Sequence, residues 1–271
     1  MGKRWKVFIA ILIAGAFLSP VAVYLVHPDL SRLSEERPGK TSFMEYRERQ
    51  WKREGIRRKI RQKWVPLARI SPYVLKAVII AEDDKFWAHE GFDFEAIQKA
   101  LEKDLKRRKL QAGGSTISQQ LVKNLYLTPA RNPIRKLKEA VLTWRLERNL
   151  SKRRIIEIYL NVAEWGDGIF GIEAASRHYF GKNAADLTAR EAALLAVVLP
   201  SPLRYRPVGG GGYVERRAEA ILGIMVRRGI VVPGYEEMLN EPPASGTSPG
   251  GSGGGAAGNL PPAENGGRPE P

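Results

Sequence analysis

The first residue that could do proton chemistry is a carboxylate at the end of an apolar segment. Apolar residues recur at helical spacing over 71–81, so we expect a buried helix that delivers Glu82 and Asp83 to a polar loop. Desolvation there would raise the pKa of a carboxyl group, which suits a general base working near neutral pH. Taken alone, Glu82 fits a capping or salt-bridged acid better than a base, so other segments must decide.

A second acid, Glu139, lies on a helix that we expect to begin at Pro133. Its neighbours Arg135 and Lys136, with Arg131 just before the helix, surround the helix N-terminus with positive charge. Such an arrangement is a plausible cradle for a diphosphate. An exposed ion pair between Arg135 and Glu139, four residues apart, is the alternative. The apolar stripe of this helix, from which the charged residues should project away, is Ile134, Leu137, Val141 and Trp144.

A glycine pair at 113–114 precedes a run of hydroxyl and amide side chains. Ser115, Gln119 and Gln120 offer hydrogen bonds suited to sugar or phosphate oxygens, and Lys123 follows them. The run lacks the Gly-Lys-Ser/Thr ending of a Walker loop. As a lone motif it could also be an ordinary turn followed by a polar helix face.

The elements that must position these residues are mostly helical. From Pro66 to about Gly234 apolar residues recur at intervals of three and four, which predicts a mainly α fold. Helix N-caps are expected at Asn132, Ser151 and Thr188, the last as a capping box with Glu191. The segment 152–161 has the spacing of a packed helix and is interpreted as architecture rather than chemistry.

The N-terminus predicts a membrane anchor. Residues 7–26 carry no charge, and a 20-residue helix spans about 30 Å, one hydrocarbon thickness. Basic residues within 1–6 place the N-terminus in the cytoplasm and the rest of the chain outside it. A cleaved signal peptide is the alternative, although the apolar stretch is longer than usual and lacks a clear cleavage site.

Composition narrows the class of partner. The formal net charge of +15 indicates an anionic partner, and the predicted anchor argues against nucleic acid. The absence of cysteine excludes disulfides, thiolate nucleophiles and zinc–cysteine sites. Residues 27–65 read as a linker and a basic membrane-proximal segment, in which 46–64 could lie on anionic lipid or form a solvated face. Residues 242–271, rich in glycine and proline, read as a disordered tail.

Four motifs in this order resemble the peptidoglycan glycosyltransferase family over residues 66–208. The matching motifs are Glu82-Asp83-x-x-Phe86-x-x-His89-x-Gly91, Gly113–Gln120 with Lys123-Asn124, Arg135-Lys136-x-x-Glu139, and Lys152-x-x-Ile155-x-x-x-Tyr159-Leu160-Asn161. The resemblance implies a lysozyme-like α fold of two lobes, residues 66–234, behind a single N-terminal transmembrane helix in the bacterial inner membrane. It also implies polymerisation of lipid II into β-1,4 glycan strands with release of undecaprenyl diphosphate.

The resemblance implies roles for the candidate residues. Glu82 would be the base that deprotonates the acceptor hydroxyl, and Glu139 the second acid, acting through a cation or by positioning basic groups. The remaining positions would hold the donor and its diphosphate: Ser115, Gln119, Gln120, Lys123, Arg131, Arg135 and Lys136. No organic cofactor is expected, whereas Mg²⁺ is possible. Asp84 departs from the family pattern and could raise the pKa of Glu82 or weaken phosphate attraction.

Two other functions fit parts of the sequence. A glycan-cleaving, lysozyme-like enzyme also uses two carboxylates in a helical cleft, although it has no diphosphate to hold. A non-catalytic protein that recruits other cell-wall enzymes would need neither acid. The expected partners are lipid II, the growing glycan strand, the membrane and other cell-wall or division proteins. No Ser-x-x-Lys occurs, which argues against an added transpeptidase domain.

Overall fold

The computed structural model describes residues 4, 7, 27–107, 114–129 and 132–231, and these belong to one compact unit ending at Pro233. Apart from Val7, the predicted transmembrane span 7–26 lies outside the described residues, as do Arg131 and the predicted tail 242–271. Of the helices in the described ranges, none is both long and apolar enough to cross a bilayer.

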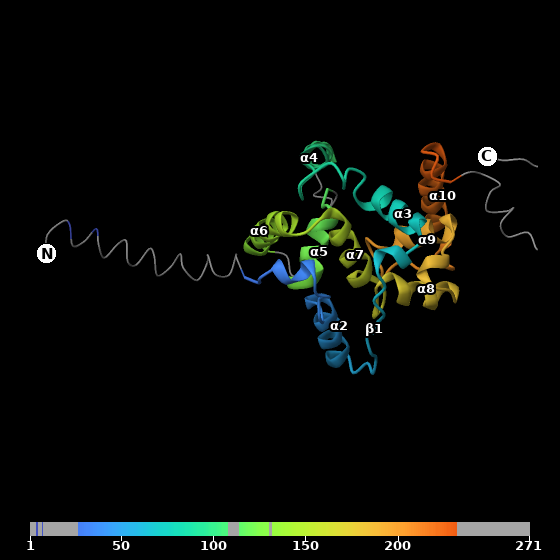
Figure 1. The fold of residues 1–271 in the computed structure, drawn as a ribbon, viewed down its shortest axis with the longest axis horizontal. Coiled ribbons are helices and arrows are strands. Elements are labelled where there is room, and N and C mark those ends of the chain that lie inside the picture. Colours follow the sequence, from blue (N-terminus) through green and yellow to red (C-terminus); the bar gives the residue numbers. More distant parts are fainter. Residues whose placement is uncertain (1–3, 5–6, 8–26, 108–113, 130–131, 232–271) are drawn as a thin grey trace, which may run out of the picture. The chain divides into compact units, whose positions relative to one another are not determined.

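The described chain is mainly helical, which confirms the predicted fold class (Figure 1). The α-helices are α2 (Ser42–Arg53), α3 (Pro72–Glu82), α4 (Phe94–Arg107), α5 (Ile117–Tyr126), α6 (Pro133–Asn149), α7 (Lys152–Val162), α8 (Ile172–Phe180), α9 (Ala189–Val198) and α10 (Gly211–Arg227). Three 3₁₀ turns lie at Ser31–Ser34, Leu67–Arg69 and Ala184–Asp186. A small sheet consists of β1 (Arg61–Gln62), β2 (Glu164–Gly166) and β3 (Ile169–Phe170), with β3 in the centre, parallel to β1 and antiparallel to β2.

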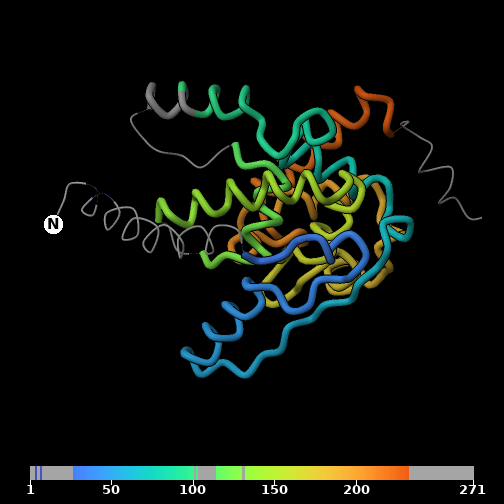
Figure 2. Tube along the Cα trace, turned by 60° about the vertical axis from the view of Figure 1, so that its left-hand side comes forward, coloured from blue at the N-terminus to red at the C-terminus, as the bar shows by residue number. Residues whose placement is uncertain are grey.

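The helices pack in two groups. α3 and α10 pack against α9, whereas α5 packs against α2, α6 and α7. In the tube view of Figure 2 the green and yellow-green helices of the second group lie beside the blue α2 segment, while the red-orange α10 lies with the teal α3. The acid candidates come from different groups, because Glu82 ends α3 and Glu139 lies on α6.

Local sequence signals explain where several helices begin. The side chains of Asn132 and Ser151 accept from the backbone N–H three residues on, and Thr188 forms a capping box with Glu191. These predicted caps are confirmed. Each one satisfies a backbone donor that the first helical turn leaves without a partner.

The packing of α3 against the core determines the position of Glu82. α9 is buried along nearly its whole length and packs against α3, in which Val74, Ala77 and Val78 are fully buried. Asp83 then leaves helical geometry as the C-cap. The predicted buried helix over 71–81 is therefore confirmed, and it delivers Glu82 to the surface of the core.

The apolar stripe of α6 faces outward, which corrects the simplest reading of the sequence pattern. Ile134, Leu137 and Trp144 are 63%, 54% and 51% exposed. The face that packs against the protein instead contains Glu139, which is 3% exposed, together with Lys138, Leu142, Thr143 and Leu146. An apolar period locates one face of a helix, but it does not say whether that face meets the core.

Residues 27–65 are more than a linker. Leu30 and Leu33 belong to the main core, α2 packs against α5, and Trp51 is buried. Arg47 of α2 forms a buried bidentate ion pair with Glu164 of β2, with N–O distances of 2.9 and 2.8 Å. The packed unit therefore extends well before residue 66, because a segment that looks strongly basic can bury its few apolar residues and pair an arginine internally. The membrane-proximal role of this segment stays a prediction.

Candidate active site

Glu82 has one satisfied and one unsatisfied carboxylate oxygen. Oε2 accepts a hydrogen bond from Nε2 of Gln120 at 2.7 Å. Oε1 is buried and has no hydrogen-bond partner among the described residues. Burial raises the pKa of Glu82, opposed by the Gln120 hydrogen bond and the charge of Lys123. A buried oxygen without a donor is costly, which marks it as a place where a substrate donor can bind.

Gln120 is held in turn by Tyr159 of α7. The Tyr159 hydroxyl donates to Oε1 of Gln120 at 2.9 Å, so the amide nitrogen must face Glu82. Tyr159 is 1% exposed, and burial raises its pKa well above the usual value, which keeps the hydroxyl protonated. The sequence pattern assigned 152–161 to architecture alone, but one of its side chains orients the contact to Glu82.

The loop after Glu82 is tied to α5 and α6. The Asp83 carboxylate accepts from the backbone N–H of Ile117, the first residue of α5, at 2.9 Å and contacts Nε2 of His89 at 2.9 Å. Nδ1 of His89 accepts from the N–H of Gly91 at 3.0 Å, which assigns the proton to Nε2. Gly91 has φ +93°, and a Cβ there would lie 2.9 Å from Thr143 of α6. α5 and α6 thereby hold the loop that directly follows Glu82.

Glu139 lies in a different electrostatic setting. Its two carboxylate oxygens accept from Nη1 of Arg135 at 3.1 Å and from Nζ of Lys136 at 2.5 Å. The Glu139 side chain is buried, whereas that of Lys136 is more than half exposed. The ion pair with Arg135 predicted from their spacing is therefore present, but it is buried at the acid rather than exposed. Glu139 holds two cations close together at the start of α6.

Lys123 of α5 connects the two acids electrostatically. Burial lowers its pKa, while the charges of Glu139 and Glu82 both oppose that shift. Arg135 and Lys136 act on the same ammonium group and add to the lowering. Lys123 thus lies within electrostatic reach of two sets of residues, Glu82 with Gln120, and Glu139 with Arg135 and Lys136.

The other candidate residues have different positions. Ser115 is exposed at the turn before α5. Gln119 is buried, and its side-chain oxygen accepts from the backbone N–H of Thr116 in a capping box, so its amide is used to start α5. A donor-binding role for these two residues stays a prediction, as does the role of Arg131, which lies outside the described residues.

Asp84 does not act on Glu82 in the expected way. It forms a bidentate ion pair with Arg228 at 2.6 and 2.8 Å, and this arginine lowers its pKa. The neighbouring acid that raises the pKa of Glu82 is Asp83. The additional negative charge of Asp84, which departs from the family pattern, is therefore neutralised by Arg228 at the C-terminal end of α10.

A pocket of about 530 Å³ opens beside these residues. Gln120, Lys123 and Tyr159 line one side, and the segment 199–204 lines another. Arg47 and Glu164, the buried pair between α2 and β2, also contribute. A larger pocket of about 910 Å³ lies next to the small sheet, away from both acids.

A role for Mg²⁺ beside Glu139 stays a prediction, and the described residues form no preformed cage for it. Both oxygens of Glu139 are already occupied by Arg135 and Lys136. Within the ranges that the structure describes, His, Asp and Glu side chains form no group of three or more that could hold a metal. Octahedral oxygen coordination would require Glu139 to release its cations.

Sequence reasoning missed Asp83, His89 and Tyr159 as positioning residues. A signal existed for Asp83 and His89, because both stand at fixed places in the first motif. Tyr159 likewise stands at a fixed place in the fourth motif, but nothing near it in the sequence indicates its contact with Gln120, which joins residues 39 apart. Its hydroxyl is useful only because α5 and α7 pack together.

A helical fold that sets a desolvated carboxylate near a second acid paired with cations defines a class of enzyme: one that uses a carboxylate base on a substrate with an anionic group. The chain matches the model of the Transglycosylase family over residues 49–226. It is 48% identical over 193 residues to a biosynthetic peptidoglycan transglycosylase of Nitrosospira multiformis, covering 71% of this chain and 84% of the relative.

Two further relatives with the same description support that match. The one from Dechloromonas aromatica is 52% identical over 188 residues, covering 69% of this chain and 81% of the relative. The one from Aromatoleum aromaticum is 55% identical over 170 residues, covering 62% and 73%. The chain belongs to the transglycosylase family.

Proposed function

We propose that this protein is a peptidoglycan glycosyltransferase that polymerises lipid II into β-1,4 glycan strands and releases undecaprenyl diphosphate. The observation that carries the proposal is a buried oxygen of Glu82, near Gln120 and Lys123, that has no hydrogen-bond partner in the described part of the chain. Membership of the transglycosylase family, with relatives described as biosynthetic peptidoglycan transglycosylases, supports it.

Glu82 acts as the general base. Its unpaired Oε1 accepts the proton of the acceptor's 4-hydroxyl while that oxygen attacks C1 of the donor sugar. The new C1–O bond forms as the bond from C1 to the diphosphate oxygen breaks, and the electron pair leaves with the diphosphate. Because burial raises the pKa of Glu82, it is a stronger base than an ordinary carboxylate.

The cations beside Glu139 receive the leaving group. Lys123, Arg135 and Lys136 stabilise the negative charge that develops on the diphosphate, and Glu139 keeps the last two in place. Preorganised groups of this kind are worth roughly 3 to 4 kcal/mol each when they act on developing charge. Arg131 would add to this set.

The protein works at a membrane surface in this proposal. The exposed side chains of Ile134, Leu137 and Trp144 on α6 offer an apolar surface next to the proposed diphosphate site. Phe94 and Ile97 of α4 are exposed as well. An apolar face beside a lipid-linked substrate fits contact with the lipid phase, and the uncharged run 7–26 fits an anchor in the inner membrane with the catalytic unit outside the cytoplasm. The two helix groups correspond to the two lobes of the family fold.

The deciding experiment offers the full-length protein lipid II and, separately, finished glycan strands. We expect polymer from lipid II and no shortening of preformed strands. Loss of the strands without polymer from lipid II would replace the proposal with a glycan-cleaving enzyme. No reaction on either, with cell-wall synthesis intact in cells that carry Glu82→Gln, would favour a recruiting protein.

A further inference from the structure

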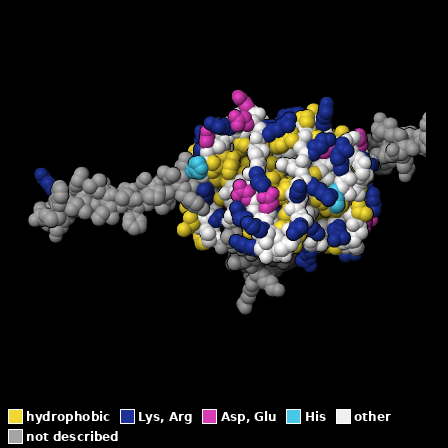
Figure 3. Space-filling model, turned by 90° about the horizontal axis from the view of Figure 1, so that it is seen from below, with side chains coloured by type: hydrophobic (Ala, Val, Ile, Leu, Met, Phe, Trp, Pro, Cys, Tyr) yellow, Lys and Arg dark blue, Asp and Glu magenta, His cyan; other side chains and the backbone are white. Residues whose placement is uncertain are grey.

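A second, larger pocket lies beside the small sheet, with a strongly basic lining. Its volume is about 910 Å³, and it is bounded by β1, β3, α8 and residues 202–208. Five Lys and Arg side chains line it, against a single acid, Asp167. On the face seen in Figure 3, Lys and Arg side chains likewise outnumber acidic ones. A recess with this charge balance favours an anionic ligand.

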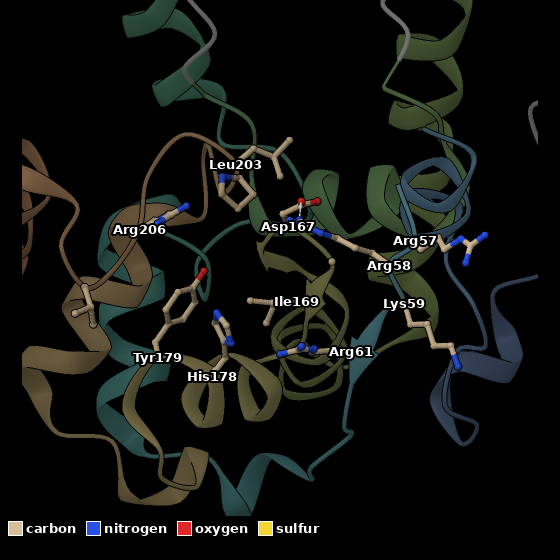
Figure 4. A pocket seen from close by; sticks show the side chains of 13 residues that line it. Arg57, Arg58, Lys59, Arg61, Asp167, Ile169, His178, Tyr179, Leu203 and Arg206 are labelled. Carbon is tan, nitrogen blue, oxygen red and sulfur yellow. Dashed lines mark hydrogen bonds and ion pairs between the residues drawn. The ribbon is translucent and has the colours of Figure 1, made fainter. Parts of the chain in front are cut away.

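The positive charge of this pocket is not neutralised from within. Asp167 is engaged by Arg58 in an ion pair and accepts from Nε1 of Trp51 at 3.1 Å. Arg61 and Arg206 form no ion pair with any described residue. Figure 4 shows Arg61 and His178 on one side of the cavity and Arg206 with the Tyr179 hydroxyl on another. Two guanidinium groups that no described acid pairs with therefore line the same space.

The pocket is built on fixed backbone. Arg61 lies in β1, where its N–H donates to the carbonyl of Gly168 at 2.8 Å. Gly168 has φ +74°, and a Cβ there would lie 2.3 Å from the ring of Trp51, so the hairpin closes tightly over that ring. The Tyr179 hydroxyl donates to the carbonyl of Trp165 at 3.2 Å. This is a preformed recess rather than a flat charged face.

Its place in the fold suggests what it binds. Pro202 and Leu203 line both this pocket and the one beside Glu82, so the two adjoin. α7 packs against both α6 and α8, which lie on opposite sides of it (Figure 1). α7 thus lies between the basic pocket and the two diphosphate cations of α6, Arg135 and Lys136, whereas Lys123 lines the adjoining pocket. A ligand that reaches both pockets would be continuous with the sugar chain rather than with the lipid.

We propose that this pocket binds the carboxylates of the peptide stems on the glycan strand under elongation, which rests on the proposed function. Guanidinium groups recognise carboxylates through paired N–H donors. Arg61 and Arg206 contact the stem, and Arg58 stays with Asp167. A bilayer surface is planar and meets only the rim of such a recess, which favours a strand over lipid headgroups.

The first test measures binding directly. The full chain is titrated with soluble, uncross-linked glycan–peptide fragments and with the same fragments after amidation of their carboxyl groups. We expect the double variant Arg61→Gln/Arg206→Gln to bind intact fragments about tenfold more weakly at low salt. Wild-type protein should bind amidated fragments as weakly as the variant binds intact ones. The matched control is Lys76→Gln/Arg227→Gln, two exposed cations on α3 and α10.

Equal binding by the wild-type protein and the double variant would overturn the proposal, as would equal binding of intact and amidated fragments. If the double variant unfolds at the same temperature as the wild-type protein, a loss of binding is not caused by a loss of folding. Binding to vesicles of phosphatidylglycerol is measured in parallel, because lipid headgroups are the alternative ligand. If the double variant lost vesicle binding while it kept fragment binding, the pocket would belong to lipid and the proposal would fail.

A second readout is the length of strands made from lipid II. The double variant should make shorter strands at a near-normal initial rate, because the first transfer does not need the distal stem. Unchanged strand length would contradict the proposal. If wild-type protein made no polymer at all, the proposed function would fail, and the fragment titration would still decide whether the pocket binds carboxylates.

Discussion

The end of α3 and the first turns of α6 each contain a glutamate, and the surroundings of the two carboxylates are opposite in character. Glu82 has one oxygen bound by a neutral amide and one that no described residue contacts by a hydrogen bond, and burial raises its pKa. Glu139 has both oxygens bound by cations. The first can take a proton, while the second can only organise charge. Environment rather than residue type assigns the roles.

The substitution Glu82→Gln tests this difference between the two acids most strongly. The amide keeps the shape of the side chain but cannot accept a proton, so we expect polymerisation of lipid II to fall about 10²- to 10⁴-fold with the fold intact. Glu90→Gln, which changes an exposed acid in the same loop, is the control and should have normal activity. Near-normal turnover in Glu82→Gln would remove the assigned base.

Glu139→Gln should have the next largest effect. Without the acid, Arg135 and Lys136 lose their common partner, so we expect an activity loss of about 10²-fold in the same assay. Stability should also fall, because Arg135 is mostly buried and keeps an uncompensated charge.

A double variant, Glu139→Gln/Arg135→Gln, separates the two effects. It should recover thermal stability, because the unpaired buried charge is gone, but not activity. Recovery of both would mean that Glu139 serves the fold alone, and the contrast between the two acids would lose its catalytic meaning.

Tyr159→Phe sharpens the account of Glu82. Without the hydroxyl, Gln120 has no donor that fixes its orientation, and we expect kcat to fall about tenfold with little change in KM. The unpaired amide oxygen should reduce the free energy of unfolding by about 1 to 3 kcal/mol. Tyr126→Phe is a matched control, since that hydroxyl has no hydrogen bond to the described residues. Equal effects of the two substitutions would argue against a positioning role.

The smallest expected effect is a change in how the free energy of unfolding depends on pH. A carboxyl group whose pKa is raised on folding binds a proton more readily in the folded state, so its contribution to stability falls as pH rises from 4.5 through the raised value. Denaturant unfolding between about pH 4 and pH 8 should therefore show a shallower decline in Glu82→Gln than in the wild-type protein. Identical pH profiles would mean that Glu82 is not desolvated. The acid limb of the activity profile should also lie above pH 4.5.

Much of the fold was predictable because its signals are local. Caps such as Asn132 and Thr188 and the apolar spacing over 71–81 act within a few residues, and the structure confirms them. Whether the apolar face of a helix points toward the core or toward solvent is not determined by the local sequence. α6 and α7 both show apolar spacing, but α7 buries its apolar residues while α6 exposes Ile134, Leu137 and Trp144 and buries Glu139.

The sequence by itself determined the mainly helical class, the helix starts and both acids as candidates, because composition, capping and motif spacing are properties of short segments. Only the tertiary structure decided which acid has an oxygen without a partner among the described residues, since Gln120 of α5 binds Glu82, Tyr159 of α7 orients Gln120, and the charge of Lys123 acts on Glu82. It also decided that Arg47 is paired with Glu164, 117 residues away. Burial and charge at one side chain are set by neighbours distant in sequence, and for that reason the chemistry of Glu82 and Glu139 follows from packing.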